Sequence, residues 1–173
     1  MKNNIYIRIA EPKDAEKVHN LMVKVLSLLI DKSIYVCEDF DFVKQQIETD
    51  SGFALCACDV NNDEIIGVFL CHYPKLADYN IGRDIGLDDN ALFQVVHMET
   101  AAVLPEYRGQ GLQVEMFKFA ETIIDKGKYH HLLGLVSPYN PPSIKSFEKS
   151  GYIQVITKEK YDGRLRHIYH KIV

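Results

Sequence analysis

Residues 103–113 read V-L-P-E-Y-R-G-Q-G-L-Q and carry the most informative pattern in the chain. The stretch begins as the end of a strand, passes through a turn with two glycines and opens a helix. Gly109 and Gly111 let the backbone approach a ligand closely, and the first turn of a helix presents unpaired N–H groups that suit a phosphate. Arg108 adds a positive charge. The same glycines are also compatible with an ordinary strand-to-helix turn, so the stretch alone leaves both interpretations open.

The chain on either side alternates between strand and helix patterns. Apolar residues two apart predict strands, and apolar residues three and four apart predict helices. The predicted order is β-α-α-β-β-β-α-β-α-β-β, without the repeated βαβ unit or the glycine motifs of the common nucleotide-binding folds. The predicted strands are 5–9, 53–60, 65–73, 93–104, 132–136 and a pair around Tyr161-Asp162-Gly163-Arg164, and the predicted helices are 13–30, about 40–47, 112–127 and 141–151.

Residues 74–90 interrupt this regular pattern. The segment has no clear period, and it contains Asp78, Asp84, Asp88 and Asp89. A loop of this length inside a compact domain is uncommon and often serves as a lid or a binding loop. Its acidic side chains are either solvated or help to select a cationic ligand.

The composition narrows the class of protein. The chain has 173 residues, a formal net charge of −4 and 47% apolar residues, which predicts one globular domain over residues 1–173. The mild acidity argues against a general nucleic-acid binder. Lys24 and Asp31 interrupt or end the apolar run of residues 21–30, and no signal peptide is visible, so we expect a cytoplasmic protein without a membrane span. The four cysteines form no C-x-x-C pair and are expected to be reduced thiols.

A second motif lies downstream of the glycine turn. Residues 140–152 read N-P-P-S-I-K-S-F-E-K-S-G-Y. Together the two motifs resemble the GNAT-type N-acetyltransferases, whose acetyl-CoA loop follows Q/R-x-x-G-x-G/A and whose later helix follows N-x-x-A/S-x-x-x-Y/F-E-K-x-G-F/Y. The resemblance extends over nearly the whole chain. It implies an α/β (α+β) fold of one domain, with a mixed, mostly antiparallel sheet of about seven strands flanked by about four helices.

The resemblance also implies acetyl-CoA as cosubstrate and no metal. Arg108 takes the first position of the loop pattern and Gly111 the fourth, whereas Gln113 replaces the usual glycine or alanine. The Gln113 side chain would point away, donate to a phosphate or narrow the site. The backbone N–H groups near Ala102 and Val103 would polarise the thioester carbonyl. The implied cofactor-binding residues are Ala102, Val103, Arg108, Gly109, Gln110, Gly111, Leu112, Gln113, Asn140, Ser143 and Phe147.

The catalytic groups follow from the same resemblance and from proton chemistry. Many relatives carry a tyrosine that acts as general acid where this chain has Phe147. A thiolate with a pKa near ~8.5 departs without full protonation, whereas an alkyl amine with a pKa near ~10 must first lose a proton. Candidate bases lie on the strand before the turn, where His97, Glu99, Ala101 and Val103 are expected to share one face. Glu99 or His97 would accept the proton, directly or through a water.

The first hypothesis is therefore direct transfer of an acetyl group from acetyl-CoA to a primary amine of a small molecule or peptide. No cysteine lies in either motif, which disfavours a covalent enzyme intermediate. The alternative is a non-catalytic acyl-CoA-binding regulatory or interaction module, which Phe147 and Gln113 would suit, and a third is a structural interaction domain that binds no coenzyme A. The expected partners are acetyl-CoA and an amine acceptor, without nucleic acid or membrane, in a monomer or a homodimer.

Overall fold

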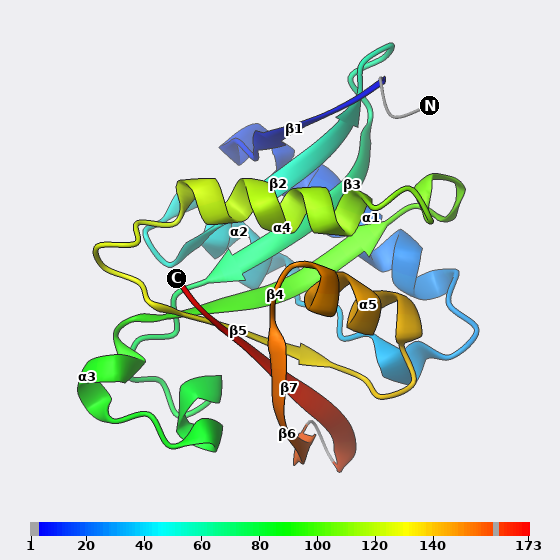
Figure 1. Ribbon diagram of the computed structural model, residues 1–173. Coiled ribbons are helices and arrows are strands. Elements are labelled where there is room, and N and C mark those ends of the chain that lie inside the picture. Colours follow the sequence, from blue (N-terminus) through cyan, green and yellow to red (C-terminus); the bar gives the residue numbers. More distant parts are fainter. Residues whose placement is uncertain (1–3, 161–162) are drawn as a thin grey trace.

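The computed structural model describes residues 4–160 and 163–173 as one seven-stranded sheet with helices on both faces (Figure 1). The strand order is β1-β2-β3-β4-β5-β7-β6, and all neighbours are antiparallel except β4 and β5. The expected mixed, mostly antiparallel sheet is confirmed. The strands are β1 (Ile5–Ile9), β2 (Gly52–Asp59), β3 (Ile65–His72), β4 (Val95–Val103), β5 (His131–Val136), β6 (Ile153–Lys160) and β7 (Arg164–Ile172).

Helices cover the two faces of the sheet. Helices α1 and α2 pack on one face against β2, β3 and β4, whereas α4 packs on the other face with α5 beside it (Figure 1). The α-helices are α1 (Ala15–Ser27), α2 (Phe40–Glu48), α3 (Asp89–Leu92), α4 (Leu112–Ile123) and α5 (Pro141–Lys149). Short 3₁₀ helices are η2 (Pro12–Asp14), η3 (Lys32–Ile34), η4 (Ile81–Ile85) and η5 (Pro105–Tyr107).

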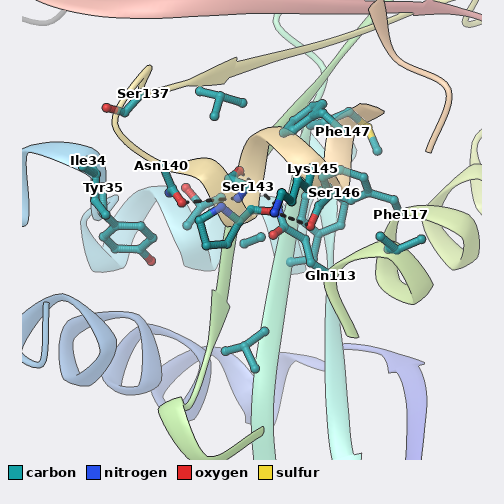
Figure 2. A pocket seen from close by; sticks show the side chains of 18 of the residues that line it. Ile34, Tyr35, Gln113, Phe117, Ser137, Asn140, Ser143, Lys145, Ser146 and Phe147 are labelled. Atoms are coloured by element: carbon teal, nitrogen blue, oxygen red, sulfur yellow. Dashed lines mark hydrogen bonds between the residues drawn. The ribbon is translucent and has the colours of Figure 1, made fainter. Parts of the chain in front are cut away.

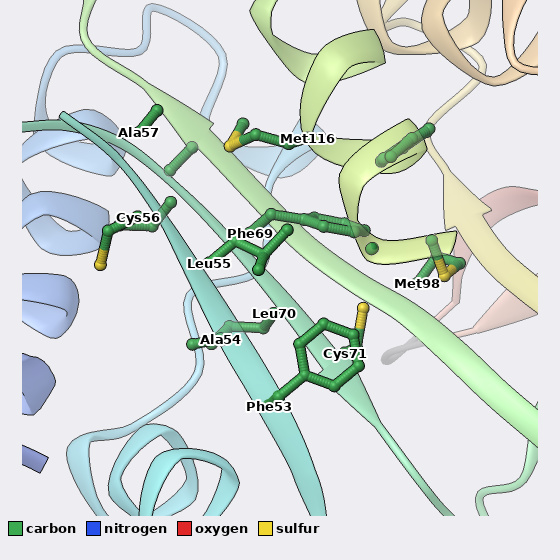
Figure 3. Packing of buried hydrophobic residues seen from close by; sticks show 14 of the residues in the cluster. Phe53, Ala54, Leu55, Cys56, Ala57, Phe69, Leu70, Cys71, Met98 and Met116 are labelled. Atoms are coloured by element: carbon green, nitrogen blue, oxygen red, sulfur yellow. The ribbon is translucent and has the colours of Figure 1, made fainter. Parts of the chain in front are cut away.

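The core between the sheet and α4 is rich in aromatic side chains. Phe69 of β3 packs on Phe117 of α4 with ring centroids 4.8 Å apart, and Figure 3 shows Met98 and Met116 around Phe69. The residues of β2 and β3 that alternate with these point to the other face of the sheet, which α1 and α2 cover. The four cysteines are free thiols, and three of them are buried in the hydrophobic core on one side of the sheet or the other.

Several element boundaries differ from the sequence-based expectations. The first helix begins as η2 and ends at Ser27, before the expected end at residue 30. Residues 74–90 are not a structureless loop, because they contain η4 and the start of α3. The next strand therefore begins at Val95 rather than at residue 93. The β6–β7 pair is antiparallel as expected, but Tyr161 and Asp162 of the predicted turn lie outside the described residues.

Strands β4 and β5 diverge partway along their length. They pair in parallel only where Val95–His97 faces His131–Leu133. Beyond that point β5 continues to Val136 paired with β7, and β4 continues to Val103 paired with β3 (Figure 1). Within the described residues, the facing edges of β4 and β5 share no further ladder, so this edge of β4 is open to a ligand.

A bulge in β4 lies at the level of this divergence. Phe69 of β3 pairs with Ala101, and Cys71 pairs with Met98, so β4 has one extra residue between these pairs, at 99–100. Paired residues of an antiparallel ladder point to the same face. Met98 and Ala101 therefore both lie on the face of Phe69, toward α4.

The bulge corrects one expectation about β4. His97 pairs with His72, and the two rings lie 5.9 Å apart on the face that α1 and α2 cover. Glu99 lies beside His97, whereas Ala101 and Val103 belong to the α4 face. The expectation that these four residues of β4 share one face is wrong, because the bulge shifts the alternation by one residue.

Candidate active site

The turn between β4 and α4 leaves the start of α4 open. Gly109 and Gly111 have φ values of +76° and +78°, in the left-handed region that favours glycine. Gly111 is the N-cap residue of α4, and no side chain among the described residues caps this helix. The first N–H groups of a helix lack backbone partners, and the positive end of the helix dipole lies there. This end of α4 therefore suits a phosphate.

The same turn faces open space. A Cβ added at Gly109 or Gly111 would meet no atom of the described residues within 4 Å. Arg108 lies beside the glycines, with its Nε donating to the carbonyl oxygen of Val103 at 3.0 Å. The absence of side chains at Gly109 and Gly111 therefore leaves space in front of this turn, which we call the phosphate cradle, and a ligand can approach the backbone there.

A cavity of about 720 Å³ runs from this turn past the open edge of β4 to the end of α1. Gln110 instead lines a separate groove between β1 and α4, and Ala102 is 1% exposed on the far face of the sheet, so the side chains of these two predicted residues do not reach the cavity. The other predicted cofactor-binding residues line it: Val103, Arg108, Gly109, Gly111, Leu112, Gln113, Asn140, Ser143 and Phe147.

The second motif forms one wall of the cavity. Asn140 is the N-cap of α5, and its side-chain oxygen accepts the N–H of Ser143 at 3.3 Å. Gln113, in the first turn of α4, donates to Oγ of Ser143 at 3.4 Å (Figure 2). The Gln113 side chain thus points across the site toward α5 and not away from it. This contact holds the starts of α4 and α5 together at the cavity.

Phe147 is a core residue that also borders the cavity. Its side chain is 3% exposed, and its ring centroid lies 4.8 Å from that of Phe117 and 5.2 Å from that of Tyr169. A Cβ added at Gly134 would lie 2.4 Å from Cζ of Phe147, so the ring occupies the space of a side chain at position 134. The ring carbon that carries the hydroxyl in tyrosine faces β5 here. The aromatic neighbours and the contact with Gly134 therefore accommodate an apolar ring and leave no space for a hydroxyl group on it.

The two candidate bases lie next to each other on β4. His97 is 3% exposed, and its Nδ1 lies 3.3 Å from Oε2 of Glu99, while its Nε2 accepts the backbone N–H of Ile81 at 3.0 Å. Glu99 lines the cavity, and 16% of its side chain is exposed. Burial acts to raise the pKa of Glu99, but the hydrogen bond with His97 and the nearby histidines lower it, and the net direction is downward.

The far end of the cavity holds polar residues that the sequence did not single out. Glu38 and Tyr35 line it together with Glu99 and with Arg166, whose guanidinium donates to the carbonyl oxygen of Ser33 at 2.7 Å. Burial and the nearby Glu99 carboxylate raise the pKa of Glu38 to about 7. The Tyr35 hydroxyl is buried and has no hydrogen-bond partner among the described residues. Each of these residues stands alone in the sequence, so no motif pointed to them.

Two of the four acidic residues of segment 74–90 make contacts within the protein, whereas Asp78 and Asp89 are exposed. Asp84 pairs with Lys158 at 3.0 Å and with Lys160 at 2.6 Å, which ties the segment to β6. Asp88 caps α3 by accepting the N–H of Ala91. Asp84 is paired with lysines of this chain, so neither expected alternative describes it, whereas Asp88 is exposed to solvent, as the first alternative expects, and also caps α3.

Two further observations concern metals and membranes. Among residues 4–160 and 163–173, no three His, Cys, Asp or Glu side chains gather as they would around a metal ion. In the same part of the chain, no helix combines the length and the apolar character that crossing a membrane requires.

Comparisons with known proteins agree with this architecture. The sequence model of the acetyltransferase (GNAT) family matches residues 28–152, and no curated protein matches the chain. Ribosomal-protein-S5-alanine acetyltransferase from Vibrio fischeri has a similar structure (15% identity, 98% of this chain and 93% of that one, TM-score 0.72). NAA60 from Arabidopsis thaliana, solved with acetyl-CoA, is also similar (17%, 98% and 98%, 0.71), as is aminoglycoside acetyltransferase AAC(6')-Ib, solved with coenzyme A and kanamycin (15%, 97% and 94%, 0.68). At these identities the likeness concerns the fold.

Proposed function

Because the chain belongs to the GNAT family of acetyltransferases, we propose that it moves the acetyl group of acetyl-CoA to a primary amine of a small molecule or a peptide. The observation that carries this proposal is the continuity of one cavity. This cavity extends from the uncapped start of α4, along the part of β4 that is not paired with β5, to the carboxylate of Glu99. A phosphate cradle, a reaction edge and a base therefore face the same space.

The start of α4 would hold the pyrophosphate of acetyl-CoA. The first N–H groups of the helix, unblocked by any side chain at Gly109 and Gly111, supply the donors, and Arg108 supplies a positive charge. Val103 and Asn140 would bind the pantetheine arm, since both line the cavity beyond this cradle. When bound, acetyl-CoA supplies an acetyl group activated as a thioester.

The edge of β4 supplies a backbone donor for the thioester carbonyl. The N–H of Leu104 donates to the carbonyl oxygen of Ile66 in β3 at 3.0 Å. Because N–H directions alternate along a strand, the N–H of Ala102 also points toward β3, whereas that of Val103 points toward the gap left by β5. We therefore assign the donor that polarises the carbonyl oxygen to Val103 and not to Ala102.

Glu99 would act as the base. An alkyl ammonium with a pKa near ~10 must lose a proton before its nitrogen can attack. The lowered pKa means that Glu99 is ionised and has a free lone pair, and its position in the cavity, rather than its basicity, allows it to take that proton directly or through a water. The nitrogen then bonds to the acetyl carbon, the carbon–sulfur bond breaks, and the second N–H proton passes to solvent or to the departing thiolate. A thiolate with a pKa near ~8.5 departs readily, so the reaction needs no acid at Phe147.

The far end of the cavity favours a cationic acceptor. Glu38 and Glu99 place two carboxyl groups there against the guanidinium of Arg166, and the ionised carboxylate of Glu99 attracts an ammonium group. Apolar side chains of Val25, Leu29 and Ile34 line the same end, so the carbon skeleton of the acceptor would pack against them.

This proposal is tested by incubating the protein with acetyl-CoA and a panel of primary amines. The release of the free thiol of coenzyme A measures turnover. Glu99→Gln keeps the shape of the side chain and removes its charge, so we expect unchanged coenzyme A affinity and turnover reduced by about 10²-fold or more. Coenzyme A binding without turnover of any amine would support the non-catalytic acyl-CoA-binding module instead, for which the apolar Phe147 is the motivation. Absence of coenzyme A binding would refute both.

A further inference from the structure

We infer that His97 is a positioning residue whose proton is placed by the backbone amide of Ile81, so that segment 74–90 orients the base Glu99. The inference rests on the proposed role of Glu99. It assigns the segment a function that its sequence does not suggest, because the contribution comes from a backbone N–H and not from one of its acidic side chains.

The hydrogen-bond geometry determines where the proton of His97 lies. An N–H group can donate only to a ring nitrogen that carries a lone pair. The N–H of Ile81 lies 3.0 Å from Nε2 of His97, so Nε2 is unprotonated and the neutral ring carries its proton on Nδ1. Nδ1 lies 3.3 Å from Oε2 of Glu99, and an ionised carboxylate only accepts hydrogen bonds. The donors therefore point in one direction, from Ile81 to His97 to Glu99.

This arrangement separates the roles of the two candidate bases. The lone pair of Nε2 is occupied by Ile81, and Nδ1 already carries a proton, so His97 has no free site to take a proton from an acceptor amine. Glu99 lines the cavity, and His97 does not. His97 therefore acts through Glu99: its N–H fixes the carboxylate in place and favours the ionised form.

The amide of Ile81 is held firmly enough for this task. Asn80, which is 1% exposed, accepts the N–H of Gly82 at 2.8 Å and donates to the carbonyl oxygens of Lys75 and Leu92 at 2.6 and 3.2 Å. Its side chain thus ties the start of the segment to the end of α3 on either side of Ile81. A buried amide side chain with all these partners is a rigid anchor.

Other titratable groups also face the His97–Glu99 pair, and any change with pH must be read against them. They come from three elements that pack around β4. These groups are His72 and Cys71 of β3, Tyr79 of segment 74–90, and Glu38 before α2.

The location of the proton can be measured without any assay of activity. Nitrogen NMR of the ¹⁵N-labelled full chain distinguishes a protonated from an unprotonated ring nitrogen. For His97 we expect a protonated Nδ1 and an unprotonated Nε2 at neutral pH, assigned by loss of the signals in His97→Leu. A proton on Nε2 would overturn the inference, whatever reaction the protein catalyses.

The role of the amide can be isolated with a matched pair of variants. Ile81 is the first residue of η4, and Asn80 before it has ψ 118°, so proline is compatible with this backbone. Ile81→Pro removes the N–H together with the buried side chain, whereas Ile81→Ala removes only the side chain. We expect kcat of Ile81→Pro to lie about tenfold below that of Ile81→Ala, with the same KM for acetyl-CoA. Equal kcat values would show that the amide has no role.

The role of His97 can be tested with a second pair. In His97→Asn the side-chain amide takes the place of Nδ1–H and can still donate to Glu99, whereas His97→Leu cannot. We expect kcat of His97→Leu about tenfold below that of His97→Asn. The acid limb of the kcat/KM profile of His97→Leu should move to higher pH, because Glu99 loses the donor that stabilises its charge.

The outcomes separate this inference from the proposed function. If His97→Asn loses as much activity as Glu99→Gln, His97 is itself a base and the inference fails. A wild-type protein without acetyltransferase activity would refute the proposed function, and the NMR result would still decide where the proton lies.

Discussion

Replacing Gly111 with valine should weaken coenzyme A binding at least about tenfold, or about 1.4 kcal/mol. The added Cβ would meet no atom of the described residues within 4 Å, and Gly111 lines the cavity, so the substitution acts on the space in front of the helix. The valine would occupy the volume in front of the first N–H groups of α4. Loss of one hydrogen bond to a charged phosphate costs about 1.5–3 kcal/mol, so a tenfold effect is the lower bound.

The same substitution also strains the backbone, and this effect needs a control. At φ +78° a residue with a Cβ is strained by about 1–2 kcal/mol, which lowers the free energy of unfolding. Gly86, at the end of η4, has φ +79° and an equally open Cβ direction, but it does not line the cavity. Gly86→Val should therefore lose similar stability and keep its affinity for coenzyme A.

Urea denaturation measures the stability of both variants, and calorimetry measures their affinity for coenzyme A. Similar affinities for Gly111→Val and Gly86→Val would remove the start of α4 as the pyrophosphate site. If Gly111→Val does not fold, Gly111→Ala provides the same comparison with a smaller side chain and Gly86→Ala as its partner.

Two further predictions concern Phe147 and Glu38. Phe147→Tyr should lower the free energy of unfolding by about 1–3 kcal/mol without raising kcat, because the hydroxyl would be forced against β5 near Gly134. Denaturation measures the stability and an activity assay measures kcat. An increase in kcat at unchanged stability would show that the hydroxyl reaches the cavity. Glu38 has a pKa raised to about 7 in the folded protein, so the folded state binds its proton more tightly than the unfolded chain, and stability should decrease as pH rises from about 4.3 toward 7. Glu38→Gln should therefore have a higher Tm than the wild type above pH 7 and the same Tm below pH 4; a Tm difference that does not vary with pH would contradict the raised pKa.

The order of strands and helices could be predicted from the sequence, because each element is encoded by residues close to one another in the chain. The alternation of Ile5–Ile9, the proline and acidic residues before α1, and the apolar spacing in α4 are all local signals. The glycine turn is also local. A φ above zero at Gly109 and Gly111 favours residues without a Cβ, so the two glycines mark this conformation in the sequence itself.

Boundaries were predicted less well where a local pattern was ambiguous. Segment 74–90 has no period because η4 and α3 are each about one turn long, too short for apolar spacing to repeat. The extra residue at 99–100 has no sequence signature either. A bulge is defined by the pairing of β4 with β3, so a two-residue spacing applied to β4 alone placed Ala101 and Val103 on the wrong face.

The chemistry of the cavity depends on contacts between residues that are distant in the chain. Glu38 lies 61 positions before Glu99, and it becomes a second carboxyl group of the site only because the chain between η3 and α2 folds next to the middle of β4. The amide that places the proton of His97 belongs to Ile81, and any residue except proline would present the same N–H group at that position. Backbone donors, pairing registers and raised pKa values arise from packing across the whole fold, and for that reason the glycine turn could be found in the sequence while the support of the base could not.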